Sequence, residues 1–401
     1  MNKQTHHLTE YWNRFFHDER QPINLDIFRI LIGILIFYIF ITLYPVLDSF
    51  YGLSGIAPLN VLKDYSGLGR INLFLVFPLD PYTLPVLYFS TLFFSLTLMI
   101  GLWSRFSSFA VFILMTSFHH RNIHILNSGD TLLRLFSFFM IFSPIGRAFS
   151  VDRIIRILKG TEGIEIPQAP IFGMRLLQFQ FTWVYVCATF FKLKGSEWMA
   201  GTALSTVLKI PEFQTPLSHL MAHDNLFTRF LTWSSIGVEA LLGTLIWIPR
   251  LRLPLVFIGI VFHLCIDQLM FIPLFEWIMI TGLLLFVDNQ YFLKLAALLK
   301  DKKPIEVLYD PDCTFCTRWM KVFCTLDLRQ SICWTGSQEA LTEAVYISST
   351  GNRSGGFFAF RKIVLKLPTL WILIPFFFFP GSAWIGTRVY KWIADHRYVF
   401  M

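Results

Sequence analysis

Residues 25–44 read LDIFRILIGILIFYIFITLY, a run of twenty residues that is almost entirely apolar. A transmembrane helix needs about 20 consecutive, mostly apolar residues to cross the hydrocarbon core of a bilayer. Pro45 follows the run directly, and proline has no backbone N–H with which to continue a helix. The stretch therefore predicts a membrane-spanning helix that ends at residue 44.

Similar apolar runs recur along the next 240 residues or so, which predicts an α-helical polytopic membrane bundle of about eight spans. The other predicted spans cover residues 83–103, 106–119, 132–142, 174–191, 230–248, 253–270 and 274–287. The composition agrees, because 55% of the 401 residues are hydrophobic and only 15% are charged, against about 25% in a typical soluble protein. A lipid bilayer is therefore the expected partner of residues 25–290.

The charge pattern predicts an orientation. Residues 1–24 carry an aromatic stripe at helical spacing, so we expect an amphipathic helix in the membrane interface; the stripe comprises Leu8, Tyr11, Trp12, Phe15 and Phe16. With a cytoplasmic N-terminus, the inner segments hold fourteen Lys and Arg residues and the outer segments seven. We therefore predict a multi-pass protein of the cell membrane, with its N-terminus and its C-terminal domain in the cytoplasm. The formal charge of +8 is then explained by basic cytoplasmic loops, and no nucleic acid is expected as a partner.

The pattern changes near residue 302, where a small α/β domain is predicted to run to residue 401. Short strands are expected at 305–309, 332–334 and 345–348, and helices at 316–326 and 355–367. The apolar segment LPTLWILIPFFFF, residues 367–379, is too short and too rich in proline for a confident span. We expect this segment to dock on lipid or on the membrane domain.

Cys313 and Cys316 form a CxxC motif between a predicted strand and a predicted helix (VLYDPDCTFCTRW). A thiolate at a helix N-terminus is stabilised by the helix dipole, which makes it nucleophilic. In a redox reading Cys313 attacks and Cys316 resolves the mixed disulfide. Two other readings stay open: an inactive remnant, and half of a zinc site completed by Cys324 and Cys333, whose nine-residue spacing is unusual for zinc.

Ionisable residues within membrane spans are costly and mark candidate sites; those singled out in or beside the predicted spans are Arg29, Asp130, Arg134, Glu239, His263, Asp267 and Glu276. Asp130 and Arg134 are four residues apart and can pair on one helix face. Lys192 lies among aromatic residues at the outer end of a span, where desolvation would let it act as a base. Lys192 could equally extend its ammonium group to the interface, and His263 could equally be a hydrogen-bonded structural residue.

Residues 8–290 resemble the HTTM family, whose transmembrane domain is shared with vitamin K-dependent gamma-carboxylase. The matching stretches are LDIFRILIG (25–33), GDTLLRLFSFFMIFSP with Ser150, Val151 and Asp152, FFKLKGSEW (190–198) and FHLCIDQLMFIPLFEWIMI (262–280). Lys192 falls near the lysine that the carboxylase uses as a base, whereas LNSGDTLL lacks the histidine of the family's corresponding stretch. The resemblance implies a quinone or another lipophilic ligand in the bundle, without carboxylase activity.

The C-terminal part resembles the DCC family of thioredoxin-like thiol–disulfide oxidoreductases. Its matching stretches are YDPDCTFC (309–316), FFAFRKIVLKLP (357–368) and VYKWIADHRY (389–398), with Pro311 in place of the family's usual glycine. This resemblance implies a thioredoxin-like fold and redox chemistry at Cys313 and Cys316. Three functions are therefore open: a membrane-bound thiol–disulfide oxidoreductase, a membrane-domain enzyme that uses Lys192 and His263, and a non-catalytic scaffold.

Overall fold

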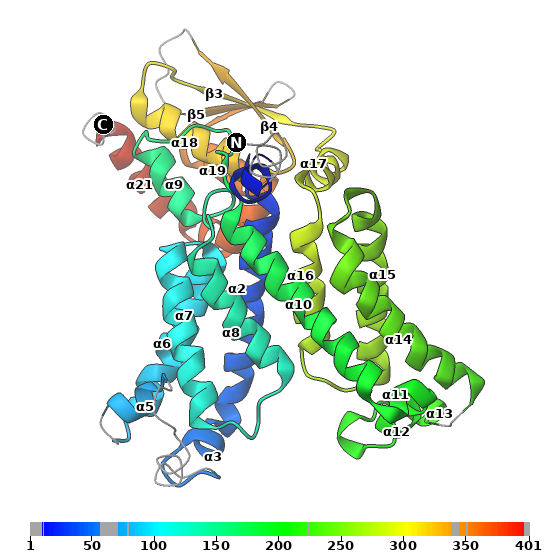
Figure 1. Cartoon of the computed structure of the whole chain (residues 1–401). Helices are drawn as coiled ribbons and strands as arrows, with labels where there is room; N and C mark the ends of the chain where they lie inside the picture. Colours follow the sequence, from blue (N-terminus) through cyan, green and yellow to red (C-terminus); the bar gives the residue numbers. More distant parts are fainter. Residues whose placement is uncertain are drawn as a thin grey trace. The chain divides into compact units, whose positions relative to one another are not determined.

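The protein is described by a computed structural model that covers residues 10, 12–56, 71–77, 80–222, 225–337, 345–349 and 352–396 (Figure 1). The chain divides into two compact units. The first comprises Met1–Asp152 and Pro167–Asn289, and the second comprises Arg153–Ile166 and Gln290–Met401.

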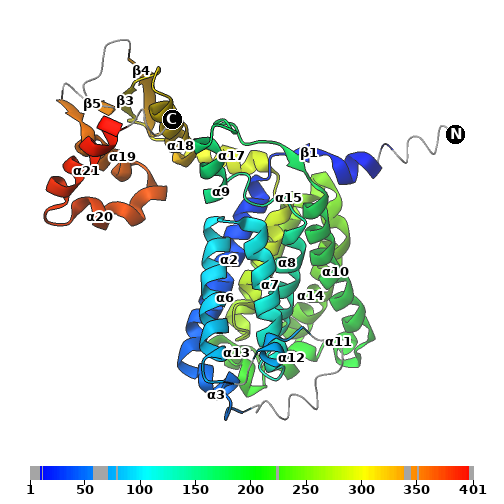
Figure 2. The same cartoon turned by 90° about the vertical axis from the view of Figure 1, so that its left-hand side faces the viewer.

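The first unit is a helix bundle in which a helix lies at each of the eight predicted spans (Figures 1 and 2). The long helices are α2 (Ile23–Leu43), α6 (Thr83–Ile100), α7 (Ser104–Arg121), α8 (Ser128–Ile141), α10 (Phe172–Lys194), α14 (Leu226–Thr244), α15 (Pro249–Leu269) and α16 (Phe275–Leu283). Neighbours in sequence pack in pairs, α2 with α6, α6 with α7, α7 with α8, α14 with α15 and α15 with α16. Helices α10 and α14 pack together as well, and α16 closes the arrangement by contacting both α2 and α8.

Short elements connect these helices. They are α3 (Leu47–Tyr51), α5 (Leu73–Val76), α11 (Ser196–Ala200), α12 (Ala203–Val207) and α13 (Pro216–Met221), with 3-10 turns η1 (Tyr44–Val46), η2 (Pro211–Phe213), η3 (Leu245–Trp247) and η4 (Leu284–Phe286). Most of helix α9 (Val151–Leu158) belongs to the second unit. The two-residue strands β1 (Glu19–Arg20) and β2 (Ala169–Pro170) pair antiparallel.

Four helical segments of the described chain are long and apolar enough to cross a membrane, or six if each of two bent helix pairs counts as one span. The four are Ile23–Tyr51, Thr83–Ile100, Leu226–Trp247 and Pro249–Leu269. The predicted spans at α7, α8 and α10 are not among them, and α16 qualifies only together with the bent segment that follows it. Helix α8 has only 14 residues, and α7 ends in two histidines and an arginine. The helices therefore lie where the sequence predicts them, and four to six segments of the described chain, against eight predicted spans, are long and apolar enough to cross a membrane.

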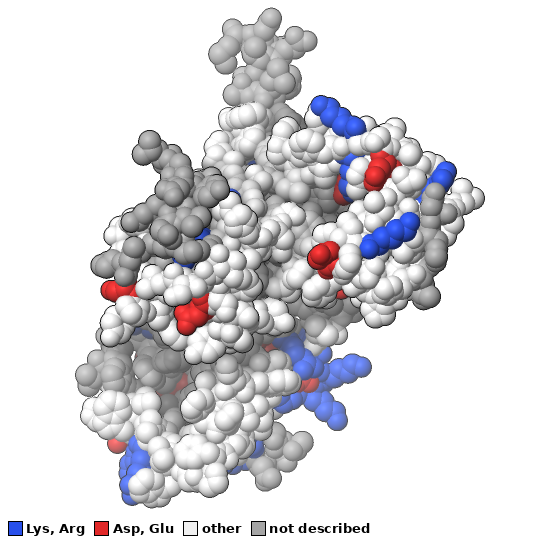
Figure 3. Space-filling view, turned by 90° about the horizontal axis from the view of Figure 1, so that it is seen from below, with Lys and Arg blue, Asp and Glu red and all other residues white. Residues whose placement is uncertain are grey.

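The bundle is apolar on its outside as well as in its core. The core includes Phe28, Phe136 and Phe181, each fully covered. Large apolar side chains such as Trp183 and Phe257 are more than half exposed on α10 and α15. The face seen in Figure 3 is largely uncharged, with Lys, Arg, Asp and Glu confined to small groups. Such a surface is suited to lipid rather than to water.

The N-terminal segment is helical over residues 12–17, within the predicted interfacial helix. The Phe15 ring lies 5.8 Å from the ring of Trp247, and the Arg175 guanidinium lies 4.3 Å above Phe15. Trp12 is 60% exposed. The Phe16 ring lies 4.9 Å from that of Phe15. Leu8 and Tyr11, which complete the predicted stripe, lie outside the described residues.

The second unit contains a four-stranded sheet with the order β4-β3-β5-β6. Its strands are β3 (Ile305–Tyr309), β4 (Ile332–Gly336), β5 (Val345–Ser349) and β6 (Asn352–Gly355). Strand β4 runs parallel to β3, whereas β5 is antiparallel to both β3 and β6. The helices are α17 (Asn289–Leu298), α18 (Thr314–Leu326), α19 (Gly356–Lys366), α20 (Ile374–Phe378) and α21 (Ser382–His396), with the 3-10 turn η5 (Pro368–Leu373). Strand β6 was not predicted, because its sequence NRSG has none of the β-branched or aromatic residues that mark strands.

A parallel crossover and a capped turn position the CxxC motif. Helix α18 connects the parallel strands β3 and β4. Two parallel strands need a crossover connection of about a dozen residues or more, and this connection is usually a helix. At its end, both carboxylate oxygens of Asp327 accept backbone hydrogen bonds, from Ser331 at 2.8 Å and from Ile332 at 2.9 Å. These bonds fix the start of β4. Val307, Phe323 and Ile363 then form a core between the sheet and the helices.

Candidate functional sites

The CxxC motif lies where β3 gives way to α18. Cys313 is the N-cap residue of α18, and its Sγ accepts a hydrogen bond from the Cys316 backbone N–H at 3.3 Å. Both thiols are buried, with Cys313 1% and Cys316 7% exposed, and both pack against Phe315 and Tyr390. A sulfur atom that accepts a backbone N–H at a helix N-terminus is in a setting that stabilises the thiolate.

An apolar pocket of about 340 Å³ opens beside this motif and has Cys316, but not Cys313, in its wall. Helix α18 contributes Trp319, Met320 and Phe323 in addition to Cys316. These positions recur at three- and four-residue intervals, so one face of α18 carries both the thiol and the pocket wall. The opposite wall comes from α21 and includes Tyr390.

The other two cysteines of this domain lie apart from the motif. Cys324 is half-buried, and burial raises the pKa of its thiol from an ordinary value near 9.0 to about 11. Cys333 is exposed on β4. Over the residues that the structure describes, no three His, Cys, Asp or Glu side chains are grouped closely enough to hold a metal ion. The zinc reading of the four cysteines therefore has no cluster to support it.

The bundle contains a second polar site, in which Lys192 is held by a carboxylate and an aromatic ring. The Nζ atom of Lys192 on α10 lies 2.8 Å from Oε1 of Glu239 on α14, and 4.3 Å from the centre of the Trp198 ring. The two charged side chains are 18% and 10% exposed. Lys192 is therefore an ion-paired lysine, rather than a lysine that simply extends from a helix end.

His263 lies in a buried hydrogen-bonded triad. The Tyr185 hydroxyl lies 2.7 Å from His263 Nε2, and His263 Nδ1 is hydrogen-bonded to Oε2 of Glu276. All three residues are buried, with at most 2% of each exposed. Glu276 thereby fixes the orientation of the imidazole and leaves Nε2 to exchange a proton with the phenol, an arrangement suited to acid–base chemistry.

The two bundle sites interact. Glu239 interacts electrostatically with His263 and Glu276, and Tyr185 interacts with both glutamates. Oε2 of Glu239 and Oε1 of Glu276 are buried and accept no hydrogen bond from any described residue. Tyr185 was missed by the sequence analysis because tyrosine is uncharged, although it lies seven residues before Lys192 and hence on the same face of α10.

Arg29, by contrast, has a structural role. It forms an ion pair with Asp26 and donates hydrogen bonds to the carbonyls of Leu98, Met99 and Phe149. Gly101 ends α6 in the left-handed conformation (φ +73°), and a side chain there would collide with Ser150 and crowd the Arg29 guanidinium. These bonds join α2 to the end of α6 and to the segment before α9.

The predicted pairing of Asp130 with Arg134 was wrong. Asp130 accepts the backbone N–H of Asn127 at 2.8 Å and so completes the capping box of α8. Arg134 points elsewhere, with its Nη1 3.4 Å from Nε2 of His120. Capping took precedence because Asp130 lies in the first turn of the helix, which was predicted to begin four residues later than it does.

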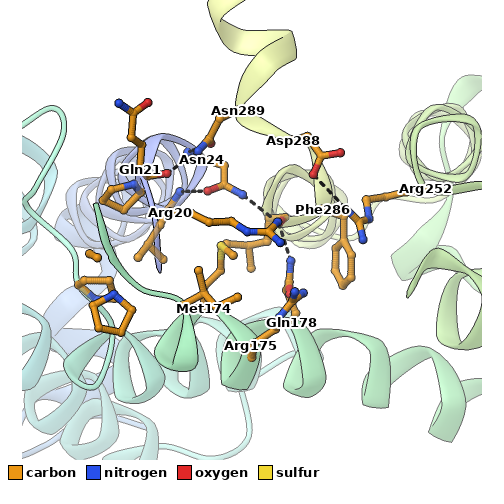
Figure 4. A pocket seen from close by; sticks show the side chains of 17 residues that line it. Arg20, Gln21, Asn24, Met174, Arg175, Gln178, Arg252, Phe286, Asp288 and Asn289 are labelled. Atoms are coloured by element: carbon orange, nitrogen blue, oxygen red, sulfur yellow. Dashed lines mark hydrogen bonds and ion pairs between the residues drawn. The ribbon is translucent and has the colours of Figure 1, made fainter. Parts of the chain in front are cut away.

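A third polar cluster surrounds a cavity of about 40 Å³ at one end of the bundle (Figure 4). Gln178 accepts a hydrogen bond from Arg175 at 2.8 Å and donates one to the Leu285 carbonyl at 2.7 Å. Asn24 donates to the same carbonyl at 3.1 Å, and Arg252 pairs with Asp288 at 2.9 Å. The cavity has room for only a few water molecules, and the hydrogen bonds around it tie helix ends together.

Comparison with known families identifies both parts of the chain. A family model described as the HTTM domain matches residues 17–291. The chain belongs to the HTTM family. The HTTM domain is followed by a match to the DCC1-like thiol-disulfide oxidoreductase model over residues 307–401. No curated protein and no solved structure matches the chain.

The stretches that carry these resemblances meet in the sites described above. In the HTTM domain they supply Arg29 to the structural cluster, and Lys192, His263 and Glu276 to the buried polar sites. In the DCC1-like domain all three stretches line the pocket, through Cys316, Phe360 and Tyr390 among others. The protein is thus a membrane protein with a thiol-disulfide oxidoreductase-like domain.

Proposed function

We propose that this protein is a membrane-bound thiol–disulfide oxidoreductase in which Cys313 and Cys316 alternate between two thiols and one disulfide. The observation that carries the proposal is the hydrogen bond from the Cys316 backbone N–H to Cys313 Sγ at the start of α18. This contact brings the two cysteines together at the helix end that stabilises a thiolate. Closing the disulfide releases two electrons and two protons to an acceptor.

A thioredoxin-like fold of residues 302–401 is part of this proposal. It is supported by the order of the elements: a parallel β3-α18-β4 unit, an antiparallel β5-β6 hairpin and the following helix α19. In thioredoxin-like proteins the active CxxC lies between the first strand of such a unit and its helix. The stretch around Cys313 and Cys316 occupies this position.

The bundle of residues 25–290 anchors the redox domain in the proposed function. We propose eight spans, one at each long helix, with residues 1–24 forming an interfacial helix. We further propose that the protein resides in the cell membrane with both its N-terminus and its redox domain in the cytoplasm. The support is the excess of Lys and Arg in the segments assigned to the inside.

A second candidate function places chemistry in the HTTM domain, and the Tyr185–His263–Glu276 triad favours it. With Lys192 as base and His263 relaying a proton through Tyr185, the bundle could act on a lipophilic ligand such as a quinone. The buried carboxylate oxygens of Glu239 and Glu276 that accept no described hydrogen bond are further sites for a ligand. Loss of turnover in Lys192→Met or His263→Leu with an intact CxxC would assign the activity to the bundle.

The redox proposal is tested with the full-length protein in detergent, equilibrated in dithiothreitol buffers of graded oxidation state. The thiols are then alkylated and the cysteine peptides measured by mass spectrometry. We expect Cys313 and Cys316 to lose their reactivity together and to form a mutual disulfide. The variant Cys333→Ser, which alters an exposed cysteine outside the motif, should leave the midpoint unchanged. Failure of the pair to form a disulfide at any accessible potential would refute the redox proposal and leave the bundle activity or a non-catalytic scaffold as the function.

A further inference from the structure

We infer that the apolar pocket beside Cys316 binds a lipid-soluble quinone, which exchanges two electrons with the CxxC motif. This inference rests on the proposed redox function and names the chemical class of the partner. The ligand lies in the C-terminal domain, not in the helix bundle where the family resemblance had suggested it.

The pocket lies between two helices that both present a continuous apolar face. Helix α18 contributes Cys316 and the residues that follow it on the same face. Helix α21 contributes Gly386, Val389, Tyr390 and Ala394, whose spacing again follows one helical face. A Cβ atom at Gly386 would lie 2.2 Å from the Phe357 ring, so the glycine lets α21 pack closely on α19. Ala394 adds only a methyl group to the pocket wall.

The chemistry of the walls favours a flat apolar ring over a peptide. Aromatic side chains from the sheet, α18, α19 and α20 surround the space; Tyr309, Trp334, Phe360 and Phe377 are among them. An extended peptide would bring a backbone N–H and C=O per residue, and burying such groups without partners costs free energy. A quinone ring carries only two carbonyls and can stack on aromatic walls. About 340 Å³ is within the usual size range of small-molecule pockets.

The surface next to this pocket is suited to lipid, which is where such a ligand would be dissolved. Ile372 is 81% and Phe376 70% exposed, and Trp384 and Trp392 on α21 are more than half exposed. Arg388 lies 3.7 Å above the Trp384 ring, which combines a cation with an amphipathic aromatic residue as membrane interfaces favour. Residues 368–396 also form one of the two bent helix pairs with the hydropathy of a span. The C-terminal domain belongs to the same chain as the HTTM domain, so a bilayer that dissolves the ligand lies within its reach.

The structure also indicates which sulfur atom contacts the ligand. Cys316 lines the pocket and contacts the quinone, whereas Cys313, outside the lining, is the thiol that closes the disulfide. In the balanced step, a Cys313–Cys316 S–S bond forms. The two electrons and the two thiol protons pass to the quinone, whose carbonyls become the hydroxyls of a hydroquinone. This assignment reverses the roles that the sequence alone suggested.

The test uses the full-length protein, reduced, freed of reductant and kept anaerobic in nanodiscs, with decylubiquinone as the probe. Oxidation of the pair is followed by alkylation and mass spectrometry, and quinone consumption by absorbance. We expect one disulfide for each quinone reduced. Ala394→Trp fills the pocket and should slow the reaction at least about tenfold, the change that corresponds to losing roughly 1.4 kcal/mol of binding. The matched control Thr387→Trp, exposed on the same helix, should react as the wild type does.

The possible outcomes distinguish the quinone site from the proposed oxidoreductase function. If diamide closes the disulfide but decylubiquinone does so equally slowly in wild type and Ala394→Trp, the quinone site is refuted and the oxidoreductase stands. If neither oxidant closes it, the oxidoreductase proposal fails. If Ala394→Trp does not fold, the wild-type protein is photolabelled with an azidoquinone instead. Labelled peptides from α18 or α21 would support the site. Label confined to bundle helices overturns it.

Discussion

Asp26 and Arg29 form an ion pair within α2 that is completely covered, with Arg29 Nε 3.1 Å from Asp26 Oδ1. The Asp26 carboxylate also accepts backbone hydrogen bonds from Gly146 at 2.6 Å, Ala148 at 2.5 Å and Phe149 at 3.1 Å. Two charges inside a membrane protein are tolerable only when each is this well paired. The pair therefore belongs to the fold of the HTTM domain rather than to its chemistry.

Replacing Asp26 with Asn should destabilise the HTTM domain strongly. The substitution keeps the shape but leaves the Arg29 charge buried without its partner, a change that typically costs about 3–5 kcal/mol. A large drop in the thermal unfolding temperature of the detergent-purified protein is expected. Asp48→Asn is the matched control, because Asp48 is exposed near the end of the same span. Equal unfolding temperatures for the two variants would contradict the structural role of the pair.

The Lys192–Glu239 contact should appear as a coupling energy in a double-mutant cycle. Lys192→Met and Glu239→Gln each break a contact of 2.8 Å between partly buried groups, so their effects on stability should be non-additive by about 0.5–3 kcal/mol. Lys194→Met provides the control, since Lys194 lies two residues away and stacks on Phe190 instead. Its combination with Glu239→Gln should be additive. Additivity in both cycles would show that the Lys192 pair does not form.

The positions of the helices and of the CxxC motif could be predicted from the sequence, because both depend on local patterns. Apolar runs marked every long helix of the bundle, and the strand–CxxC–helix order placed Cys313 at a helix start. The polar networks could not be predicted, since they join residues far apart in the chain, as Tyr185 and His263 are. Lys192, His263, Glu239 and Glu276 were singled out individually, but their pairing, and the part that Tyr185 takes in it, emerge only from helix packing.

The Tyr185–His263 hydrogen bond should couple these residues energetically. Tyr185→Phe removes the only described partner of a buried ring nitrogen, so it should destabilise the protein by about 1–3 kcal/mol. In a His263→Leu background the same change should cost much less, because no imidazole remains to be satisfied. Tyr88→Phe serves as the comparison: Tyr88 is equally buried, but its hydroxyl donates to the Phe40 carbonyl. Its effect should not depend on residue 263.

The burial of Cys324 should protect this thiol from alkylation over the pH range in which cysteines normally become reactive. The thiolate is the reactive form, and burial raises the Cys324 pKa to about 11 from an ordinary value near 9.0. At pH 8 the folded protein therefore holds about a hundredfold less Cys324 thiolate than the unfolded chain. Alkylation by iodoacetamide, quantified per cysteine by mass spectrometry, should rise for Cys324 only as the pH approaches 11.

The raised pKa of Cys324 also determines how the stability of the C-terminal domain changes with pH. Because the folded state holds the Cys324 proton more tightly than the unfolded state, the contribution is complete below about pH 9 and is lost as the pH rises towards 11. Cys324→Ala removes this contribution, so the stability of the C-terminal domain should fall less steeply between about pH 9 and pH 11. Cys333→Ala, at an exposed position, should leave the curve unchanged. A Cys324 that is alkylated at pH 8 as fast in the folded as in the unfolded protein would disprove the shift.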